Sequence, residues 1–310
     1  MEINKIYNES CLDTLRKMPD SFIDCVITSP PYWQLRDYGY PEQWGLEPTF
    51  EMYLEHLWIM MDEIYRVLKP SGTVWVNLGD TYNGTKNGNT SNKGYVENTI
   101  INTFKKEKIN NIKDKCLLLI PHRFAIGCID GGWIVRNDII WAKRNGMPES
   151  VTDRFSKKHE YFFFMVKSEK YYFDLDSIRD KNSESSLKRI EYGWKSNHDS
   201  IGNIDTERMG ERFCNPKGKN PGSVSDFWDV PTKPSSNEHY AAYNDELIRK
   251  PILAGCPEGG IIYDPFMGTG STAESAIRAN RQYIGSEMSA KYCKIAEERL
   301  KPYKQQTRLF

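Results

Sequence analysis

The chain has 310 residues, of which 39% are hydrophobic and 27% are charged, as in a soluble globular protein. Its 42 basic residues balance its 42 acidic residues, so any surface that binds nucleic acid must be local. No apolar run approaches the ~20 residues that span a bilayer, and residues 1–5 contain no signal-peptide core. We therefore expect a cytoplasmic protein with no membrane partner.

The seven cysteines are scattered along the sequence without a C-x-x-C pair, and the five histidines are isolated from one another. This pattern favours reduced thiols over a disulfide framework or a zinc site. We therefore expect no metal cofactor.

The first part of the chain alternates strand-like and helix-like segments. Residues 22–28 are rich in β-formers and are followed by Pro30-Pro31, which predicts a strand that ends there. Residues 51–68 predict a helix, with apolar side chains at helical spacing: Leu54, Leu57, Trp58, Met61, Ile64, Tyr65 and Leu68. Residues 69–72 stop this helix, and residues 73–78 predict a buried strand. Such a succession is typical of a βαβ unit and a parallel sheet.

Further elements are predicted along the chain: strands at 133–141, 161–166 and 282–287, and helices at 271–279 and 290–300. Two stretches lack periodicity. Residues 83–115 predict a mobile loop, because loops of this length in compact domains are usually functional or disordered. Residues 180–236 are polar and mixed in charge, which indicates an insertion or a small subdomain.

A glycine turn follows an apolar run near the C-terminus. Residues 260–263 are strand-like and continue into Asp264-Pro265-Phe266-Met267-Gly268-Thr269-Gly270-Ser271-Thr272. A strand, a glycine turn and a helix form a nucleoside-binding device beyond the carboxyl end of the strand. The turn lacks the third glycine of a dinucleotide fingerprint and the lysine of a P-loop. Asp264 could meet a cationic group and Glu287 could accept hydrogen bonds from ribose hydroxyls, and S-adenosylmethionine carries both kinds of group.

A second motif, the S-P-P-Y turn (residues 29–32), ends the first predicted strand. Two prolines hold this turn rigid, because proline fixes φ and donates no hydrogen bond. The Ser29 hydroxyl and the Pro30 carbonyl could orient an exocyclic amine toward a methyl donor, and Tyr32 could stack on a flipped base. Taken alone, S-P-P-Y is also compatible with a proline turn or a polyproline ligand.

Together, the S-P-P-Y turn followed by the D-P-F-x-G-x-G turn resembles the signature of amino-methylating DNA methyltransferases that act on N4 of cytosine or N6 of adenine. This order is typical of the subgroup whose catalytic motif precedes the cofactor motif. Further segments resemble this family: residues 44–47, 66–73, 77–80, 132–133, 136–143, 147–154, 159–161 and 171–174. The resemblance implies a Rossmann-like α/β methyltransferase fold with a mainly parallel seven-stranded sheet and an inserted target-recognition region.

The resemblance also implies three regions. Residues 1–179 would form the catalytic half of the core, residues 180–236 the target-recognition insertion, and residues 237–310 the half that binds S-adenosylmethionine. The implied cofactor-binding residues are Ser10, His239, Asp264, Phe266, Gly268, Gly270, Ser271 and Glu287, and the implied catalytic residues are Ser29, Pro30, Pro31 and Tyr32. Phe266 would pack on the adenine ring. Ser10 departs from the aspartate common in the family, and Asn244 stands where proline is frequent.

Serine at the first position of the S-P-P-Y turn is typical of family members that methylate N4 of cytosine, whereas aspartate or asparagine is typical of N6-adenine enzymes. Methylation at C5 is disfavoured, because it needs a thiolate that typically follows proline, and the chain has no Pro-Cys dipeptide. Three alternative functions are left open by the sequence: an N6-adenine DNA methyltransferase, an RNA or protein amine methyltransferase, and a non-catalytic DNA-binding protein.

The expected partner is double-stranded DNA, and the sequence leaves open whether a cognate restriction endonuclease acts on the same site or the chain is an orphan enzyme. The candidate DNA-binding residues form a basic cluster: Lys143, Arg144, Arg154, Lys157 and Lys158. A solvated loop is the alternative interpretation of this cluster.

Overall fold

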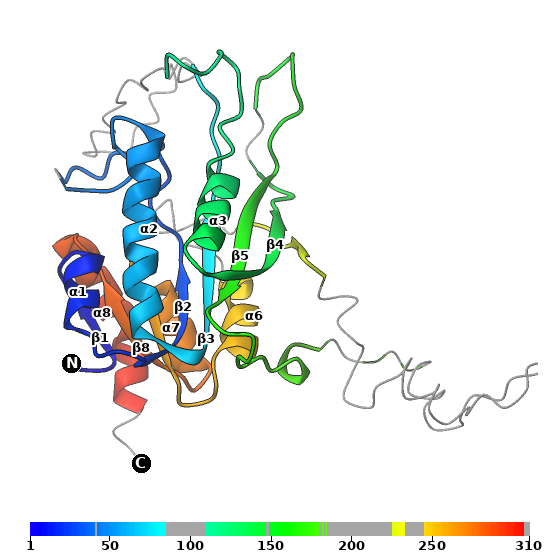
Figure 1. Ribbon diagram of the computed structural model, residues 1–310. Helices are drawn as coiled ribbons and strands as arrows, with labels where there is room; N and C mark the ends of the chain where they lie inside the picture. Colours follow the sequence, from blue (N-terminus) through cyan, green and yellow to red (C-terminus); the bar gives the residue numbers. More distant parts are fainter. Residues whose placement is uncertain are drawn as a thin grey trace, which may run out of the picture.

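An eight-stranded sheet forms the centre of the computed structural model, which describes residues 1–40, 42–84, 109–146, 149–179, 182, 184, 225–232 and 245–306 (Figure 1). The strands are β1 (Lys5–Tyr7), β2 (Ile23–Thr28), β3 (Leu68–Leu78), β4 (Ile134–Ala142), β5 (His159–Val166), β6 (Phe227–Asp229), β7 (Ile261–Asp264) and β8 (Gln282–Ser286). Their order is β1-β8-β7-β2-β3-β5-β4-β6. β5 is antiparallel to both of its neighbours, and the other adjacent pairs are parallel.

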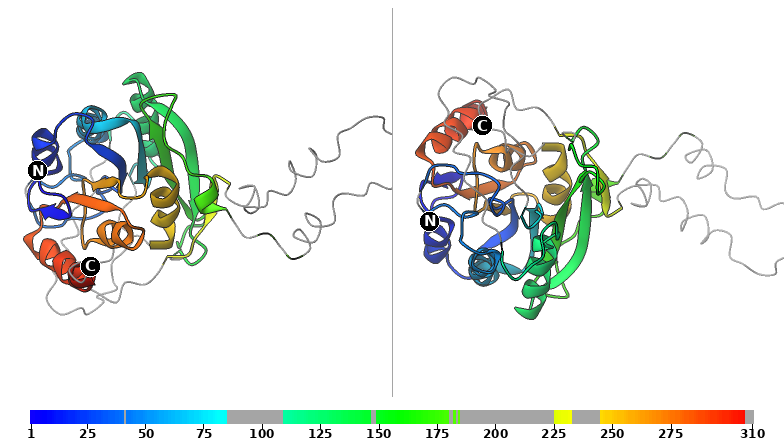
Figure 2. Two further views of the ribbon diagram at one scale, coloured as in Figure 1. Left: turned by 90° about the horizontal axis from the view of Figure 1, so that it is seen from below. Right: turned by 90° about the horizontal axis from the view of Figure 1, so that it is seen from above.

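Helices cover both faces of the sheet (Figure 2). One face carries α1 (Cys11–Lys17), α2 (Phe50–Val67) and α3 (Ile120–Asp130), and the other carries α6 (Asp245–Gly255), α7 (Ser271–Arg278) and α8 (Ala290–Gln306). A 3-10 turn, η1, spans Asp176–Ile178. Every residue of β2 and β7 is buried, as expected for central parallel strands that are covered on both sides.

A capping residue sets the start of α2, and an apolar face of the helix packs into the core. The Thr49 hydroxyl caps the helix by accepting the Met52 amide at 3.3 Å. One face of the helix is buried against the sheet: Phe50, Tyr53, Leu54, Leu57, Met60, Met61, Ile64 and Val67. β3 starts directly at Leu68, so the chain reverses direction without a separate loop.

The predicted strands and helices are confirmed, with three differences. The sheet has eight strands instead of seven, because the three-residue strands β1 and β6 pair with its two edges. β6 lies inside the stretch 180–236 that the sequence predicts as an insertion, so residues 227–229 of that stretch pair with the core sheet. Residues 69–72, predicted as a turn, belong to β3, where the register against β2 shifts between Ile23 and Cys25.

Candidate active site

A cavity of about 310 Å³ opens at the carboxyl edge of the parallel strands. Ser10 follows β1, the S-P-P-Y turn follows β2, and Glu287 follows β8, so these segments meet at one edge. Because β5 is antiparallel, its beginning lies at the same edge, and Glu160 reaches the cavity. The cavity therefore collects residues from segments that are far apart in the sequence.

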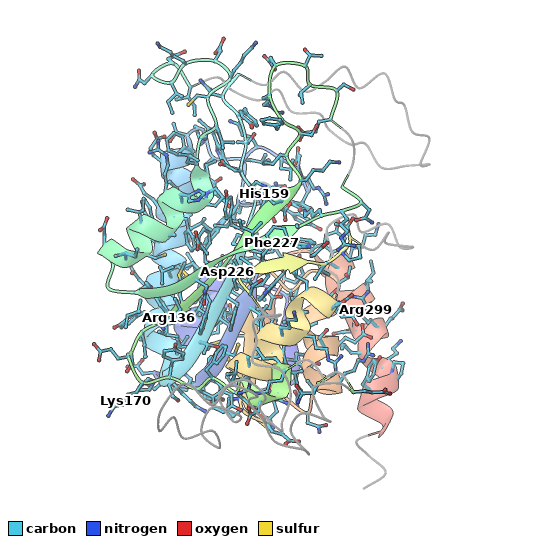
Figure 3. The ribbon with its side chains drawn as sticks, turned by 90° about the vertical axis from the view of Figure 1, so that its right-hand side faces the viewer. Arg136, His159, Lys170, Asp226, Phe227 and Arg299 are labelled. Atoms are coloured by element: carbon cyan, nitrogen blue, oxygen red, sulfur yellow. The ribbon has the colours of Figure 1, made fainter. Side chains whose placement is uncertain are left out.

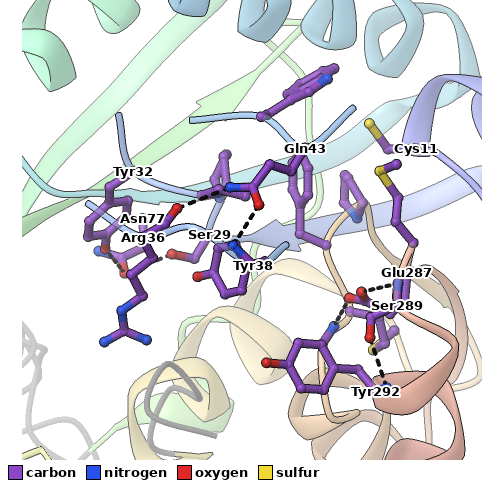
Figure 4. A pocket seen from close by; sticks show the side chains of 18 of the residues that line it. Cys11, Ser29, Tyr32, Arg36, Tyr38, Gln43, Asn77, Glu287, Ser289 and Tyr292 are labelled. Carbon is purple, nitrogen blue, oxygen red and sulfur yellow. Dashed lines mark hydrogen bonds between the residues drawn. The ribbon is translucent and has the colours of Figure 1, made fainter. Parts of the chain in front are cut away.

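The S-P-P-Y turn forms one end of this cavity (Figure 4). The Tyr32 hydroxyl lies 2.9 Å from Asn77 Oδ1 and 2.8 Å from Glu160 Oε2, and the Ser29 hydroxyl lies 3.4 Å from the same Asn77 oxygen. The Asn77 amide donates to the Tyr161 carbonyl at 3.0 Å, which sets the orientation of its side chain. Asn77 thus holds both polar groups of the S-P-P-Y turn in place.

The ring of Tyr32 needs a glycine beneath it. A Cβ atom on Gly79 would lie 2.5 Å from the Tyr32 ring, closer than real side chains approach. The Tyr53 hydroxyl also donates to the Pro31 carbonyl at 2.8 Å. The turn is therefore anchored from α2, and the glycine after β3 leaves room for the Tyr32 ring in the cavity wall.

The other end of the cavity is built around Glu287, near Ser289 and Tyr292 (Figure 4). One Glu287 oxygen accepts the Gly268 amide at 2.9 Å and the other accepts the Ser289 amide at 2.8 Å. Burial raises the pKa of this carboxyl. Phe266 lines the same end, with its ring 5.4 Å from the ring of Trp44. A carboxylate beside aromatic rings suits a nucleoside with hydroxyl groups.

The remaining predicted cofactor residues occupy different positions. Ser10 lines the cavity and also caps α1, where its hydroxyl accepts the Asp13 amide at 3.2 Å. Ser271 lines the cavity and accepts a hydrogen bond from Arg299 at 2.8 Å. Gly270 adopts φ +83° behind the cavity lining. His239 lies outside the described residues.

Asp264 does not line the cavity. Its side chain is buried at the end of β7, where its oxygens accept the Thr272 hydroxyl at 2.6 Å and the Phe266 amide at 3.0 Å. Burial raises the pKa of Asp264 to about 6. These contacts show Asp264 holding the glycine turn against α7, rather than presenting a carboxylate to the cavity.

The structure does not bring the five predicted DNA-binding residues together as a free basic surface, because each has a partner. Lys143 pairs with Glu160, Arg144 with Asp229, and Arg154 with Glu149 at 2.7 Å. Lys157 donates to the Asp80 carbonyl, and burial lowers the pKa of its ammonium group. Lys158 donates to the Gly146 carbonyl at 2.5 Å. Of the five, Lys143 lines the cavity itself.

The cavity residues that received no role from the sequence include Trp44, Asn77 and Glu160. Asn77 is 1% exposed, and a buried amide near the end of an apolar strand is an unusual placement. Asn77 could therefore have been identified from the sequence as a candidate site residue, because it is a polar residue near the end of an otherwise apolar strand. Glu160 could not be placed in this way, because its position depends on β5 running antiparallel to β3.

Six cysteines of the described residues are free, and five of them are buried. Cys11 lines the cavity, and burial raises the pKa of its thiol to about 12. Among the described residues, no group of three or more histidine, cysteine or acidic side chains could hold a metal ion. None of the helices in the described part of the chain is long and apolar enough to cross a membrane.

The fold is that of DNA methyltransferases. The PvuII DNA methyltransferase, described as cytosine-N4-specific, superposes with a TM-score of 0.62 at 15% identity, covering 99% of this chain and 93% of that chain. A putative DNA modification methylase of Thermus thermophilus, crystallised with S-adenosylmethionine, superposes with a TM-score of 0.58 at 19% identity, covering 97% and 94% of the two chains.

Sequence comparisons identify the family. Residues 23–298 match the N6_N4_Mtase family, described as DNA methylase. The type II methyltransferase M.Cfr9I of Citrobacter freundii is 34% identical over 307 residues, which cover 97% of this chain and 89% of the relative. M.SmaI of Serratia marcescens is 32% identical over 302 residues, covering 96% and 90%. The chain therefore belongs to the N6_N4_Mtase family of DNA methylases.

Proposed function

We propose that this chain is a site-specific DNA methyltransferase that transfers a methyl group from S-adenosylmethionine to the N4 amine of cytosine in duplex DNA. The observation that carries the proposal is the arrangement of one cavity, with the S-P-P-Y turn at one end and Glu287 at the other (Figure 4). An amine held at the first end faces a nucleoside held at the second.

The residues around Glu287 fit S-adenosylmethionine. Each carboxylate oxygen of Glu287 accepts one backbone amide and keeps lone-pair capacity for a ribose hydroxyl. The Phe266 ring offers a face for adenine. When bound, S-adenosylmethionine supplies a methyl group on a positively charged sulfur, and its carbon–sulfur bond breaks with the electron pair remaining on sulfur.

The chain's own residues orient the amine. An exocyclic amine is a weak nucleophile because its lone pair is delocalised into the base. The Ser29 hydroxyl can donate to Asn77 and still accept an amine proton, and the Pro30 carbonyl accepts the second proton. With both protons held, the nitrogen lone pair points toward the methyl carbon and forms the new bond. The methylated nitrogen then releases one proton to solvent.

The proposal favours cytosine because serine at position 29 is typical of family members that methylate N4 of cytosine. The decisive experiment expresses the chain in a host without DNA methylation and identifies modified nucleosides by mass spectrometry. We expect N4-methylcytosine, and no modification with the Gly268→Val variant, since Gly268 has φ +54° and a branched side chain resists that conformation.

The alternatives give different products. N6-methyladenine alone would make the cytosine assignment wrong while leaving amine methylation in place. 5-Methylcytosine would overturn the role of the S-P-P-Y turn. Methylated RNA or protein with unmodified DNA would place the chain in another class of amine methyltransferase.

The relatives named type II methyltransferases suggest a restriction–modification pair, with a cognate endonuclease that acts on the same site. Sequencing that maps modified bases in the same host DNA would give the site. DNA modified by the chain should then resist the endonuclease that cuts this site, whereas DNA from the Gly268→Val host should be cut.

A further inference from the structure

A lysine–glutamate pair forms part of the cavity wall beside Tyr32. Lys143 follows β4, and its ammonium group contacts Glu160 Oε1 and lies 4.2 Å above the centre of the Trp141 ring. The second Glu160 oxygen lies 2.8 Å from the Tyr32 hydroxyl. Lys143 and Glu160 are only 21% and 16% exposed, and both line the cavity. The ammonium group is thus fixed at the end of the cavity that holds the target base.

From this geometry we infer that Lys143 reads the edge of the flipped base by donating to O2 of cytosine, and that it selects cytosine over adenine. The inference rests on the proposed function and names the residue that distinguishes N4 of cytosine from N6 of adenine. An ammonium group has three protons and no acceptor, so after pairing with Glu160 it retains protons for the base.

The chemistry of the two bases makes this lysine selective. In both bases an acceptor ring nitrogen lies next to the amine, so that nitrogen cannot distinguish them. The next ring position carries the O2 acceptor in cytosine and a C–H group in adenine. A fixed donor that faces this position gains a hydrogen bond with cytosine alone, whereas adenine leaves the proton that faces the base without an acceptor, which is costly in a desolvated site.

The pairing with Glu160 also suits the charge of the cofactor. A lone ammonium group in the wall would repel a positively charged sulfur in the same cavity. Glu160 neutralises Lys143, and the flat Trp141 ring beneath the ammonium group favours a cation at this place. Trp141 is itself fixed, because its indole N–H donates to the Val230 carbonyl at 2.7 Å.

The alternative role of Lys143 is a phosphate contact, as its place in the basic cluster predicted. That role requires an ammonium group directed to solvent, whereas the side chain is largely buried against Trp141 and Glu160. The two roles differ in what they control: a base contact sets the preference among target bases, and a phosphate contact sets the salt dependence of DNA binding.

The test uses Lys143→Met, which keeps the aliphatic stem over Trp141 and removes the donor. Lys170→Met is the matched control, because Lys170 is exposed beyond the opposite end of β5 from His159 (Figure 3). The substrates are duplexes with the mapped site and one of three target nucleosides. These are cytosine, adenine, and a 2-aminopyridine C-nucleoside that keeps the amine and ring nitrogen but has C–H in place of the O2 carbonyl.

For the wild-type protein we expect kcat/KM to fall about 10- to 100-fold from cytosine to the 2-aminopyridine target, the range of one hydrogen bond to a charged group. Lys143→Met should lose a similar factor on cytosine, and should treat the cytosine and 2-aminopyridine targets alike within twofold. Its preference for cytosine over adenine should fall by the same factor. The affinity for S-adenosylmethionine should stay within twofold, and Lys170→Met should match the wild-type protein.

Equal wild-type rates on cytosine and 2-aminopyridine would overturn the inference even if Lys143→Met does not fold. A Lys143→Met protein that keeps the wild-type preference, or that changes only the salt dependence of binding, would return Lys143 to the phosphate role. A wild-type protein that methylates adenine and not cytosine would instead refute the cytosine assignment, and this appears in the wild-type data alone.

Discussion

Tyr32 shows how a single side chain is held for its role at the cavity. Its hydroxyl faces two acceptors, Asn77 Oδ1 and Glu160 Oε2, and has only one proton to donate. Because Lys143 pairs with the other Glu160 oxygen, the carboxylate is held in place beside this hydroxyl. The ring is therefore fixed at its tip, while Gly79 leaves room beneath it.

Tyr32→Ala should reduce turnover while leaving cofactor binding intact. Base–aromatic stacking contributes about 1–3 kcal/mol, so we expect kcat/KM for DNA to fall on the order of 10- to 100-fold. Tyr32→Phe keeps the ring and should lose less. Steady-state kinetics and calorimetry with S-adenosylmethionine measure the two effects. A loss of cofactor affinity as large as the loss of turnover would mean that Tyr32 belongs to the nucleoside end of the cavity.

At the scale of elements, the unit β7–turn–α7 depends on backbone geometry. Gly270 precedes α7 with φ +83°, and a Cβ atom there would lie 2.9 Å from the Ala296 Cβ of α8. The turn thus sets both the start of α7 and its distance from α8. Glycine is required for conformation and also for space.

Gly270→Ala should therefore lower the free energy of unfolding by more than backbone strain alone would. Gly259→Ala is the matched control, because Gly259 has φ +73° and nothing lies within 4 Å of an added Cβ. We expect Gly270→Ala to lower the free energy of unfolding by about 1–3 kcal/mol more than the control does, since it adds overpacking to backbone strain. Urea denaturation of both variants measures the difference. Equal losses would show that α8 moves aside without cost.

The same unit should give stability a dependence on pH. Burial raises the pKa of Asp264 to about 6, so the folded protein binds this proton more tightly than the unfolded chain. The resulting stabilisation is complete below about pH 4, the unfolded pKa, and is lost as the pH rises through about 6. It amounts to at most about 3 kcal/mol, because one pKa unit corresponds to about 1.4 kcal/mol.

Asp264→Asn should remove this dependence, since the amide oxygen still accepts a hydrogen bond and the Thr272 hydroxyl can turn to accept one. The quantity to measure is the free energy of unfolding of the wild-type protein minus that of the variant, in urea between pH 4 and 7. We expect this difference to fall as the pH rises. A difference that is independent of pH would contradict a raised pKa at Asp264.

The elements with a clear apolar pattern were predictable from the sequence. β2, α2 and β5 have 6, 18 and 8 residues, enough for an apolar pattern to be recognised in the sequence, and the glycine turn carries its own backbone requirement. β1 and β6 have three residues each, too few for a pattern, and they form only because a neighbouring strand offers hydrogen bonds. Non-local pairing also explains why Glu160 at the cavity was not foreseen.

At the scale of the whole molecule, the net charge is zero, so DNA binding must depend on individual cationic residues. The basic cluster illustrates this, because its members differ in availability. The Arg144 side chain is 76% exposed and lies near β6 through its pairing with Asp229. The Lys157 ammonium group is partly buried on the Asp80 carbonyl. The sequence places these cations in one cluster, whereas the fold distinguishes the exposed Arg144 from Lys157, which has an internal hydrogen-bond partner.

We therefore expect Arg144→Gln, and not Lys157→Gln, to change the salt dependence of DNA binding. A phosphate contact contributes about 0.9 to the slope of log affinity against log salt, so Arg144→Gln should lower the slope by about that amount. Asp229→Asn should strengthen binding, because it releases Arg144 from its ion pair. Lys157→Gln should reduce stability with an unchanged slope, since it removes the donor to Asp80. Fluorescence anisotropy titrations at several salt concentrations measure each slope. An unchanged slope for Arg144→Gln, with a lower slope for Lys157→Gln, would show that the loop rearranges on DNA and that Lys157 leaves its internal partner to meet the phosphates.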